Sequence, residues 1–182
     1  MPAERRWVGW GLWLGWMVAS SAGWALGLAG GFAVGFGLSG SVGGVASQCL
    51  FGAVLGVSLG TLQWILLRRH MSGAGWWIVA TMFSMGAGFA LIKAATPTLS
   101  GVLGGGPIYG FVNGAGVGVL LGAMQWLVLR GRTHRAGWWV LASGLGAGLG
   151  FALDQVVGQL VGLAITGTAL VWLLRPPAQR TV

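Results

Sequence analysis

Side chains able to do acid–base, metal or nucleophilic chemistry are few in this sequence. The only carboxylates are Glu4 and Asp154, which we expect at opposite ends of the apolar segments, so they cannot form the carboxylate pair of general acid–base catalysis. His70 and His134 lie in short basic turns, so no histidine lies within an apolar segment beside a candidate hydroxyl or thiol nucleophile. Cys49 is the single cysteine, so neither an internal disulfide nor a cysteine cluster for a metal can form. We therefore expect a protein that is not an enzyme, with no catalytic residue and no metal site.

Two glutamines are the most regular polar feature of the chain. Gln63 and Gln125 are each followed by tryptophan, and each lies one helical turn inside the basic end of an apolar segment. We interpret them as a structural polar clamp between helix ends. Other amides lie toward the opposite ends of the segments and could form an outer polar patch, although amides alone are weak evidence for a transport site. These amides are Gln48, Asn113, Gln155 and Gln159.

The elements that must position these residues are apolar and long. Hydrophobic residues make up 55% of the chain and charged residues 7%, against about 25% charged in soluble domains. Stretches of about 20 apolar residues recur, each long enough to span the hydrocarbon layer as a helix. The net charge of +8 is clustered between these stretches, where lipid headgroups would meet it, so we expect the lipid bilayer and not nucleic acid as partner.

Six membrane-spanning helices are predicted, with connections rich in Gly, Ser and Thr over 29–41 and 93–103. The N-terminal segment has the charge order of a secretory signal, but its apolar part is too long for one, so we expect a retained first span. The predicted spans are Trp7–Leu28, Val42–Leu67, Gly75–Ile92, Gly104–Leu129, Ala136–Leu153 and Val157–Leu174.

Basic residues predict the orientation of these spans. Nine of the ten fall on one side of a six-span topology, and only Lys93 falls on the other. Because Arg and Lys near span ends are retained on the cytoplasmic side, we expect a multi-pass inner (cell) membrane protein with both termini in the cytoplasm.

An internal repeat runs through the chain. Gln63-Trp64, Leu67-Arg68 and Ala74-Gly75-Trp76-Trp77 return with the same spacing as Gln125-Trp126, Leu129-Arg130 and Ala136-Gly137-Trp138-Trp139. The simplest interpretation is an all-α fold in one membrane domain, 1–182, made of three helical hairpins at approximately 7–67, 75–129 and 136–174. Two helices return the chain to its starting side, so the copies have parallel topology, compatible with a pseudo-threefold bundle.

The repeated element also resembles one found in uncharacterised bacterial multi-pass membrane proteins. The resemblance covers roughly 52–91 and 114–153 and rests on Gln-Trp-x-x-Leu-Arg, a short basic turn and Ala-Gly-Trp-Trp. It implies a polytopic fold and carries no activity or site residue with it.

Glycines spaced four residues apart predict close helix packing, because small residues let helix backbones approach in lipid. A glycine-lined pore is the alternative, but these spans lack most of the polar groups that would line one. The helix-packing candidates are Gly52, Gly56, Gly60, Gly110, Gly114, Gly118 and Gly122.

Tryptophans near the basic ends of the spans, including Trp77 and Trp139, are interpreted as an aromatic belt at the membrane interface. The alternative is a groove for a bound lipid tail, quinone or carotenoid, the one kind of ligand or cofactor that the sequence leaves open. Trp13, Trp16 and Trp24, deeper in the first span, are its candidate ligand-binding residues.

Lys93 and Asp154 are the one basic and the one acidic residue expected at the outer ends of the spans. They could form a partly desolvated ion pair or stand as two independently solvated charges.

Two functional hypotheses remain. The first is a non-catalytic membrane subunit that packs into, stabilises or helps assemble a larger complex, with other membrane subunits or a second copy as partner. The alternative is a transporter component or channel for a small solute or an apolar ligand.

Overall fold

The computed structural model describes residues 7–133, 135–153 and 155–175, and every regular element in these ranges is helical. A short π-helical turn, η2 (Trp7–Gly11), leads into the first long helix. The helices are α1 (Leu12–Val42), α2 (Gly44–Leu67), α3 (Trp76–Leu103), α4 (Pro107–Leu129), α5 (Trp138–Ala152) and α6 (Gln155–Leu174).

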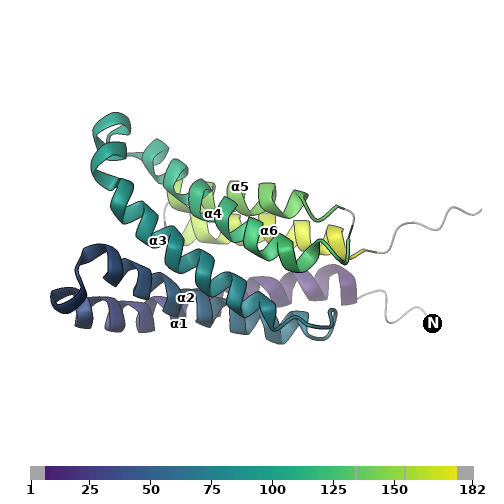
Figure 1. Cartoon of the computed structure of the whole chain (residues 1–182). Coiled ribbons are helices and arrows are strands. Elements are labelled where there is room, and N and C mark those ends of the chain that lie inside the picture. Colours follow the sequence, from purple (N-terminus) through teal and green to yellow (C-terminus); the bar gives the residue numbers. More distant parts are fainter. Residues whose placement is uncertain (1–6, 134, 154, 176–182) are drawn as a thin grey trace, which may run out of the picture.

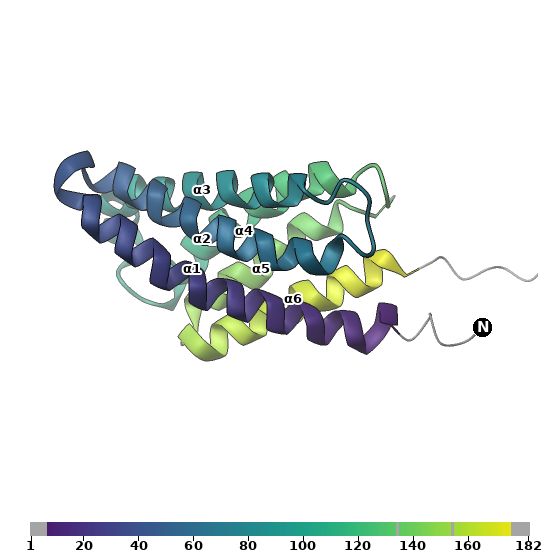
Figure 2. The same cartoon turned by 90° about the horizontal axis from the view of Figure 1, so that it is seen from below.

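The helices form three consecutive hairpins that close into a ring. Each helix contacts the next along the chain, and α1 contacts α6. The start of α1, the end of α6 and the turns after α2 and α4 lie at one end of the bundle, which we call the basic end (Figures 1 and 2). The other end, which we call the open end, carries the turns at Gly43 and Gly104. Both glycines have positive φ, 76° and 68°, where other residues would be strained.

The length and composition of the helices identify a polytopic all-α membrane protein. Among the described residues, five helices are long and apolar enough to cross a membrane. Apolar side chains such as Leu26 and Phe83 cover the outside of the bundle. The shorter α5 has 15 residues, which rise about 22 Å, against about 30 Å of hydrocarbon.

Two expected connections are helical, so the predicted loops at 29–41 and 93–103 are wrong. Helix α1 continues to Val42 and α3 to Leu103. The Gly, Ser and Thr residues that suggested loops have helical roles. Gly31 lets α1 approach Phe51 on α2, and the Thr96 hydroxyl donates a hydrogen bond to the Ile92 carbonyl within α3.

The spaced glycines lie where neighbouring helices meet inside the bundle. A methyl group added at Gly56 would lie 2.6 Å from the Thr81 carbonyl oxygen of α3. Gly118 on α4 faces the backbone of Ser143 on α5 in the same way. The remaining members also face α3 or α5, namely Gly52, Gly60, Gly110, Gly114 and Gly122. These seven glycines are therefore packed against the chain's own helices.

Arginines stack on tryptophans at the basic end. The guanidinium carbon of Arg68 lies 5.2 Å from the ring centroid of Trp64, and that of Arg130 lies 5.5 Å from the ring centroid of Trp126. Across hairpins, the Arg132 side chain donates to a backbone carbonyl of the preceding basic turn. The arrangement keeps these charges at one level, where headgroups would meet them.

Candidate ligand-binding site

Three tryptophans meet at the centre of the bundle. Trp16, Trp77 and Trp139 come from α1, α3 and α5, the first helices of the three hairpins, and all are buried. Their ring centroids are 6.2 Å (16–77), 5.7 Å (16–139) and 5.6 Å (77–139) apart. We call this cluster the tryptophan triad. It closes the interior toward the basic end, where it packs against buried side chains that include Leu67 and Leu129.

The triad corrects part of the predicted aromatic belt. Trp77 and Trp139 are core residues, whereas their neighbours Trp76 and Trp138 are 70% and 59% exposed. Adjacent residues on an α-helix point about 100° apart, and in each Trp-Trp pair the first indole faces outward while the second faces the core.

The first indole is held by an amide. Trp77 Nε1 donates to Gln63 Oε1 at 2.8 Å, and Gln63 Nε2 donates to Ser20 Oγ at 3.0 Å. Gln63 on α2 thereby joins α3 to α1 and satisfies both polar ends of its own side chain.

The second hairpin repeats this bridge. Trp139 Nε1 donates to Gln125 Oε1 at 2.9 Å, and Gln125 Nε2 donates to Thr81 Oγ1 at 2.9 Å. Gln125 on α4 thus links α5 to α3 as Gln63 links α3 to α1.

The third hairpin departs from the pattern. The buried positions just before Trp172 are Leu170 and Val171, which cannot hydrogen-bond an indole. Trp16 Nε1 instead donates to Thr166 Oγ1 on α6 at 3.1 Å. Ser143, which occupies the place of Ser20 and Thr81, has a buried hydroxyl with no hydrogen-bond partner among the described residues.

A small cavity lies beside this network. It measures about 70 Å³, and we call it the inner cavity. Its polar walls are Gln63, Gln125, Ser143 and Thr166, and Gln159 stands where it approaches a second, larger cavity. No charged residue lines it among those that the structure describes.

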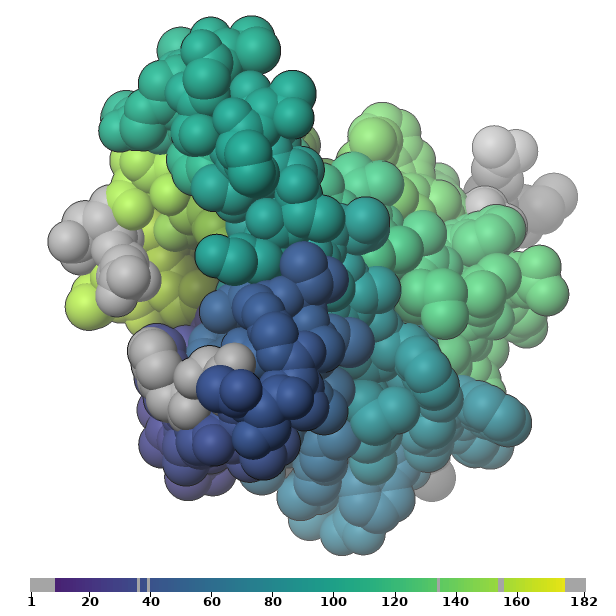
Figure 3. All heavy atoms as spheres, turned by 60° about the vertical axis from the view of Figure 1, so that its left-hand side comes forward, coloured from purple at the N-terminus to yellow at the C-terminus, as the bar shows by residue number. Residues whose placement is uncertain are grey.

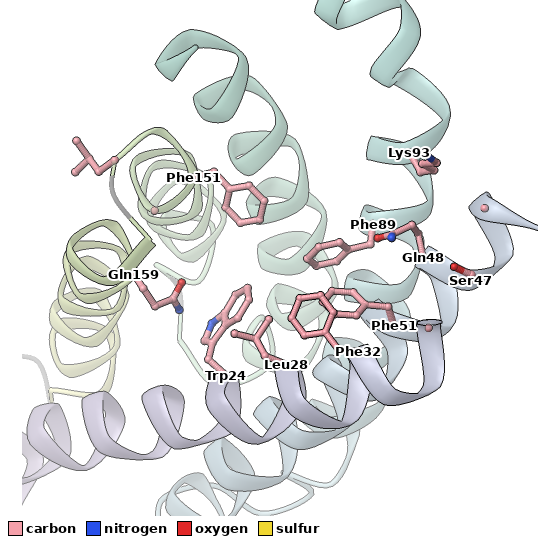
Figure 4. A pocket seen from close by; sticks show the side chains of 14 residues that line it. Trp24, Leu28, Phe32, Ser47, Gln48, Phe51, Phe89, Lys93, Phe151 and Gln159 are labelled. Atoms are coloured by element: carbon pink, nitrogen blue, oxygen red, sulfur yellow. The ribbon is translucent and has the colours of Figure 1, made fainter. Parts of the chain in front are cut away.

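The larger cavity, the outer pocket, measures about 640 Å³ and lies toward the open end. Trp24, Gly150, Phe151 and Gln159 line both cavities, so the two adjoin. Aromatic side chains from four helices surround the space (Figure 4). Phe51 bridges Phe32 and Phe89, with ring centroids 5.1 Å from each.

One charged side chain, Lys93 of α3, lines the outer pocket among the described residues. It stands with the polar Ser47 and Gln48 on the side nearest the α1–α2 turn (Figure 4). Pro97 lies inside α3 one turn after Lys93 and has no N–H to give to the Lys93 carbonyl.

The pocket opens here because the hairpins differ in length. Helices α1 and α3 have 31 and 28 residues, whereas α5 has 15. Since all three begin near the basic end, the first two hairpins project past the third. Seen from the open end, the α1–α2 and α3–α4 turns stand as separate masses (Figure 3).

The ligand candidates chosen from sequence have different positions. Trp24 lines the outer pocket, Trp16 belongs to the triad and lines only the inner cavity, and Trp13 lines neither. Trp13 Nε1 donates to Thr168 Oγ1 at 3.2 Å and ties α1 to α6. The predicted pair of Lys93 with Asp154 stays a prediction, because Asp154 lies outside the described residues.

Sequence reasoning missed the phenylalanine walls, although the repeat contained a signal. Phe151 follows Phe89 by the same interval as Trp139 follows Trp77. Leu28 likewise precedes Phe89 by the interval that separates Trp16 from Trp77. Leu28, Phe89 and Phe151 all line the outer pocket. Three apolar residues at these matching intervals in the sequence therefore face one shared space.

No family model, curated protein or solved structure matches this chain. The fold and the site together define an all-α polytopic membrane protein with an aromatic pocket between its helices.

Proposed function

We propose that this protein binds an apolar ligand in the outer pocket, as a binding or transport component for such molecules. The observation that carries the proposal is the aromatic-lined space of about 640 Å³. Ligand pockets measure about 300–1,000 Å³ and combine apolar walls with a few polar groups, a description that fits Trp24, Phe51, Phe89 and Phe151 together with Lys93 and Gln159.

The shape of the interior favours a binding pocket over an open channel. A molecule entering at the open end meets the tryptophan triad, whose rings lie within 6.2 Å of one another and whose indoles are hydrogen-bonded to α2, α4 and α6. Passage to the basic end would require the triad to separate. Ligand binding from one side is therefore the step that this conformation supports.

The proposal includes a topology of six spans in three parallel-topology repeats, with the basic end in the cytoplasm. Its support is the equivalent placement of Trp16, Trp77 and Trp139 on the three hairpins and the gathering of arginines at one end. In a bacterial inner membrane the outer pocket would then open on the side away from the cytoplasm.

The hypothesis of a structural subunit stays a prediction with weaker support. The spaced glycines are one part of its support, and the seven helix-packing candidates face the chain's own helices. Native-gel separation of the gently extracted protein, followed by mass spectrometry of its band, tests it directly.

Filling the pocket tests the proposed function. We expect butylpyrene to quench the tryptophan fluorescence of the protein in lipid nanodiscs saturably, beyond the partitioning seen with empty nanodiscs. Leu28→Trp places an indole inside the pocket and should weaken this binding at least tenfold.

The matched control is Leu26→Trp, on the same helix but 62% exposed on the outside, which should bind as the wild type does. Equal binding by both variants, or no saturable binding by the wild type, would contradict the proposed site.

A further inference from the structure

We infer that the inner cavity holds a neutral oxygen group at the leading end of the ligand, a hydroxyl or a carbonyl that hydrogen-bonds with Ser143. This inference rests on the proposed function and specifies the ligand class: an apolar body for the outer pocket that ends in one uncharged oxygen.

The argument begins with a comparison of the three hairpins. Ser20 and Thr81 each accept a hydrogen bond from a glutamine of the next helix in their hairpin. In the third hairpin the corresponding glutamine is absent, and Ser143, 3% exposed, bonds to nothing among the described residues. An unpaired buried hydroxyl is costly, so such groups in native proteins call for a partner.

No described side chain takes over this role. The Thr166 hydroxyl accepts from Trp16 and lies within hydrogen-bond distance of the Gly162 and Leu163 carbonyls of its own helix. Gln125 already uses its amide on Thr81 and its carbonyl on Trp139. The missing partner must therefore come from whatever occupies the cavity that Ser143 lines.

The position of the cavity makes a bound ligand the occupant that fits. It adjoins the outer pocket through Trp24, Gly150, Phe151 and Gln159, so one elongated molecule can reach both spaces. Its described walls carry no ionic group, and an unpaired charge would be expensive at this depth. A hydroxyl group of serine can donate or accept, so either a ligand carbonyl or a ligand hydroxyl satisfies it. Lys93, by contrast, lies at the far side of the outer pocket, where the trailing end would stand.

A matched pair of probes tests the assignment. Pyrenebutanol and butylpyrene differ by one hydroxyl, and their binding is compared by tryptophan quenching in nanodiscs. We expect the wild type to bind pyrenebutanol about tenfold more tightly, the upper end of what one neutral hydrogen bond contributes. In Ser143→Ala this preference should fall to about one, with butylpyrene binding unchanged.

The control variant is Ser84→Ala. Ser84 is also buried, but its hydroxyl donates to the Ala80 carbonyl of its own helix at 2.6 Å. Ser84 lines neither cavity, so the tenfold preference for pyrenebutanol should remain in this variant. A wild type that binds both probes equally, or an unchanged preference in Ser143→Ala, would overturn the inference and indicate that water satisfies Ser143. Either result would leave the Leu28→Trp test of the proposed function intact, whereas failure of both probes to bind would overturn both proposals.

Discussion

Indole N–H groups organise the centre of this bundle, because each needs an acceptor where water is excluded. Trp77 and Trp139 find glutamine carbonyls, and Trp16 finds a threonine hydroxyl one hairpin away along the ring. A glutamine can serve an indole and a hydroxyl at once, whereas a threonine cannot span the same distance. Because a threonine takes the place of a third glutamine, the Ser143 hydroxyl is left unpaired and lines the inner cavity.

Replacing a bridging glutamine should destabilise the fold. Gln125→Met keeps the side-chain volume but leaves the Trp139 N–H without an acceptor and removes the donor to Thr81. The Thr81 hydroxyl keeps its bond to the Trp77 carbonyl, so one buried group, the Trp139 N–H, is left unpaired. Such a group costs about 1–3 kcal/mol, and we expect a loss of that size, measured as a lower Tm in detergent. Ser58→Ala, which removes only a hydroxyl bonded to the Val54 carbonyl of its own helix, should change Tm little. An unchanged Tm in Gln125→Met would contradict the bridging role.

Repetition in the sequence was enough to single out Gln63 and Gln125, because two buried amides at the same place in two copies are rarely accidental. Their partners could not be deduced, since Ser20 and Thr81 are ordinary residues in any span. The assignment of Trp77 and Trp139 to the membrane interface is wrong, because composition near a basic end does not tell which of two adjacent indoles faces inward.

Helix contacts in this protein depend on glycines that face a neighbouring backbone. Helix α4 carries one glycine that packs against a neighbouring helix and one that does not. Gly118 meets the Ser143 carbonyl and the Ala147 side chain of α5, whereas Gly116 faces open space. Substitutions at these two positions can therefore be compared within one helix, where the helix propensity of the new residue is the same and only the packing differs.

The two glycines should respond oppositely to the same substitution. Gly118→Ala forces α4 from α5 and should cost about 1–3 kcal/mol of stability, the usual range for overpacking. Gly116→Ala adds a methyl group into open space and, because Ala favours helix, should be neutral or stabilising by up to about 1 kcal/mol. Thermal unfolding in detergent measures both. Equal losses would show that α4 and α5 do not meet at Gly118.

The helix boundaries were only partly predictable from the sequence, because some of them depend on contacts between helices. The basic turns around Arg68 and Arg130 interrupt the apolar pattern clearly and marked helix ends correctly to within a few residues. The stretches 29–41 and 93–103 contain glycines and hydroxyl residues, whose helical role depends on a neighbour such as Phe51. Local composition cannot predict a contact with a residue that only the tertiary fold brings close.

At the scale of the whole molecule, ring closure and unequal hairpin lengths create the pocket. Contact between α1 and α6 encloses a central space, and the 15-residue α5 leaves it uncovered at the open end. The all-α membrane architecture followed from composition and span length, but the pocket did not. Its apolar walls are mostly phenylalanines and leucines, residue types that elsewhere in an apolar chain would indicate helix packing or lipid contact.

The direction in which the pocket opens depends on topology, and cysteine labelling decides it. Cys49 is exposed, so it is first replaced by alanine. In that background, Thr98→Cys on the open-end part of α3 should react with a membrane-impermeant maleimide added outside spheroplasts, whereas Arg69→Cys in a basic turn should react only after lysis, since arginines are retained in the cytoplasm.

Because α5 is short, a third labelling site is needed to test whether it spans the membrane. Leu153→Cys, immediately after α5, should label from outside as Thr98→Cys does, because a third hairpin must carry the chain across the bilayer before α6 returns it. A rise of about 22 Å can cross a hydrocarbon layer of about 30 Å only if the bilayer thins or interfacial residues complete the span. Labelling of Leu153→Cys from the inside alone would leave α5 as a non-spanning helix. The third hairpin would then not be a copy of the first two, and the six-span topology would be wrong.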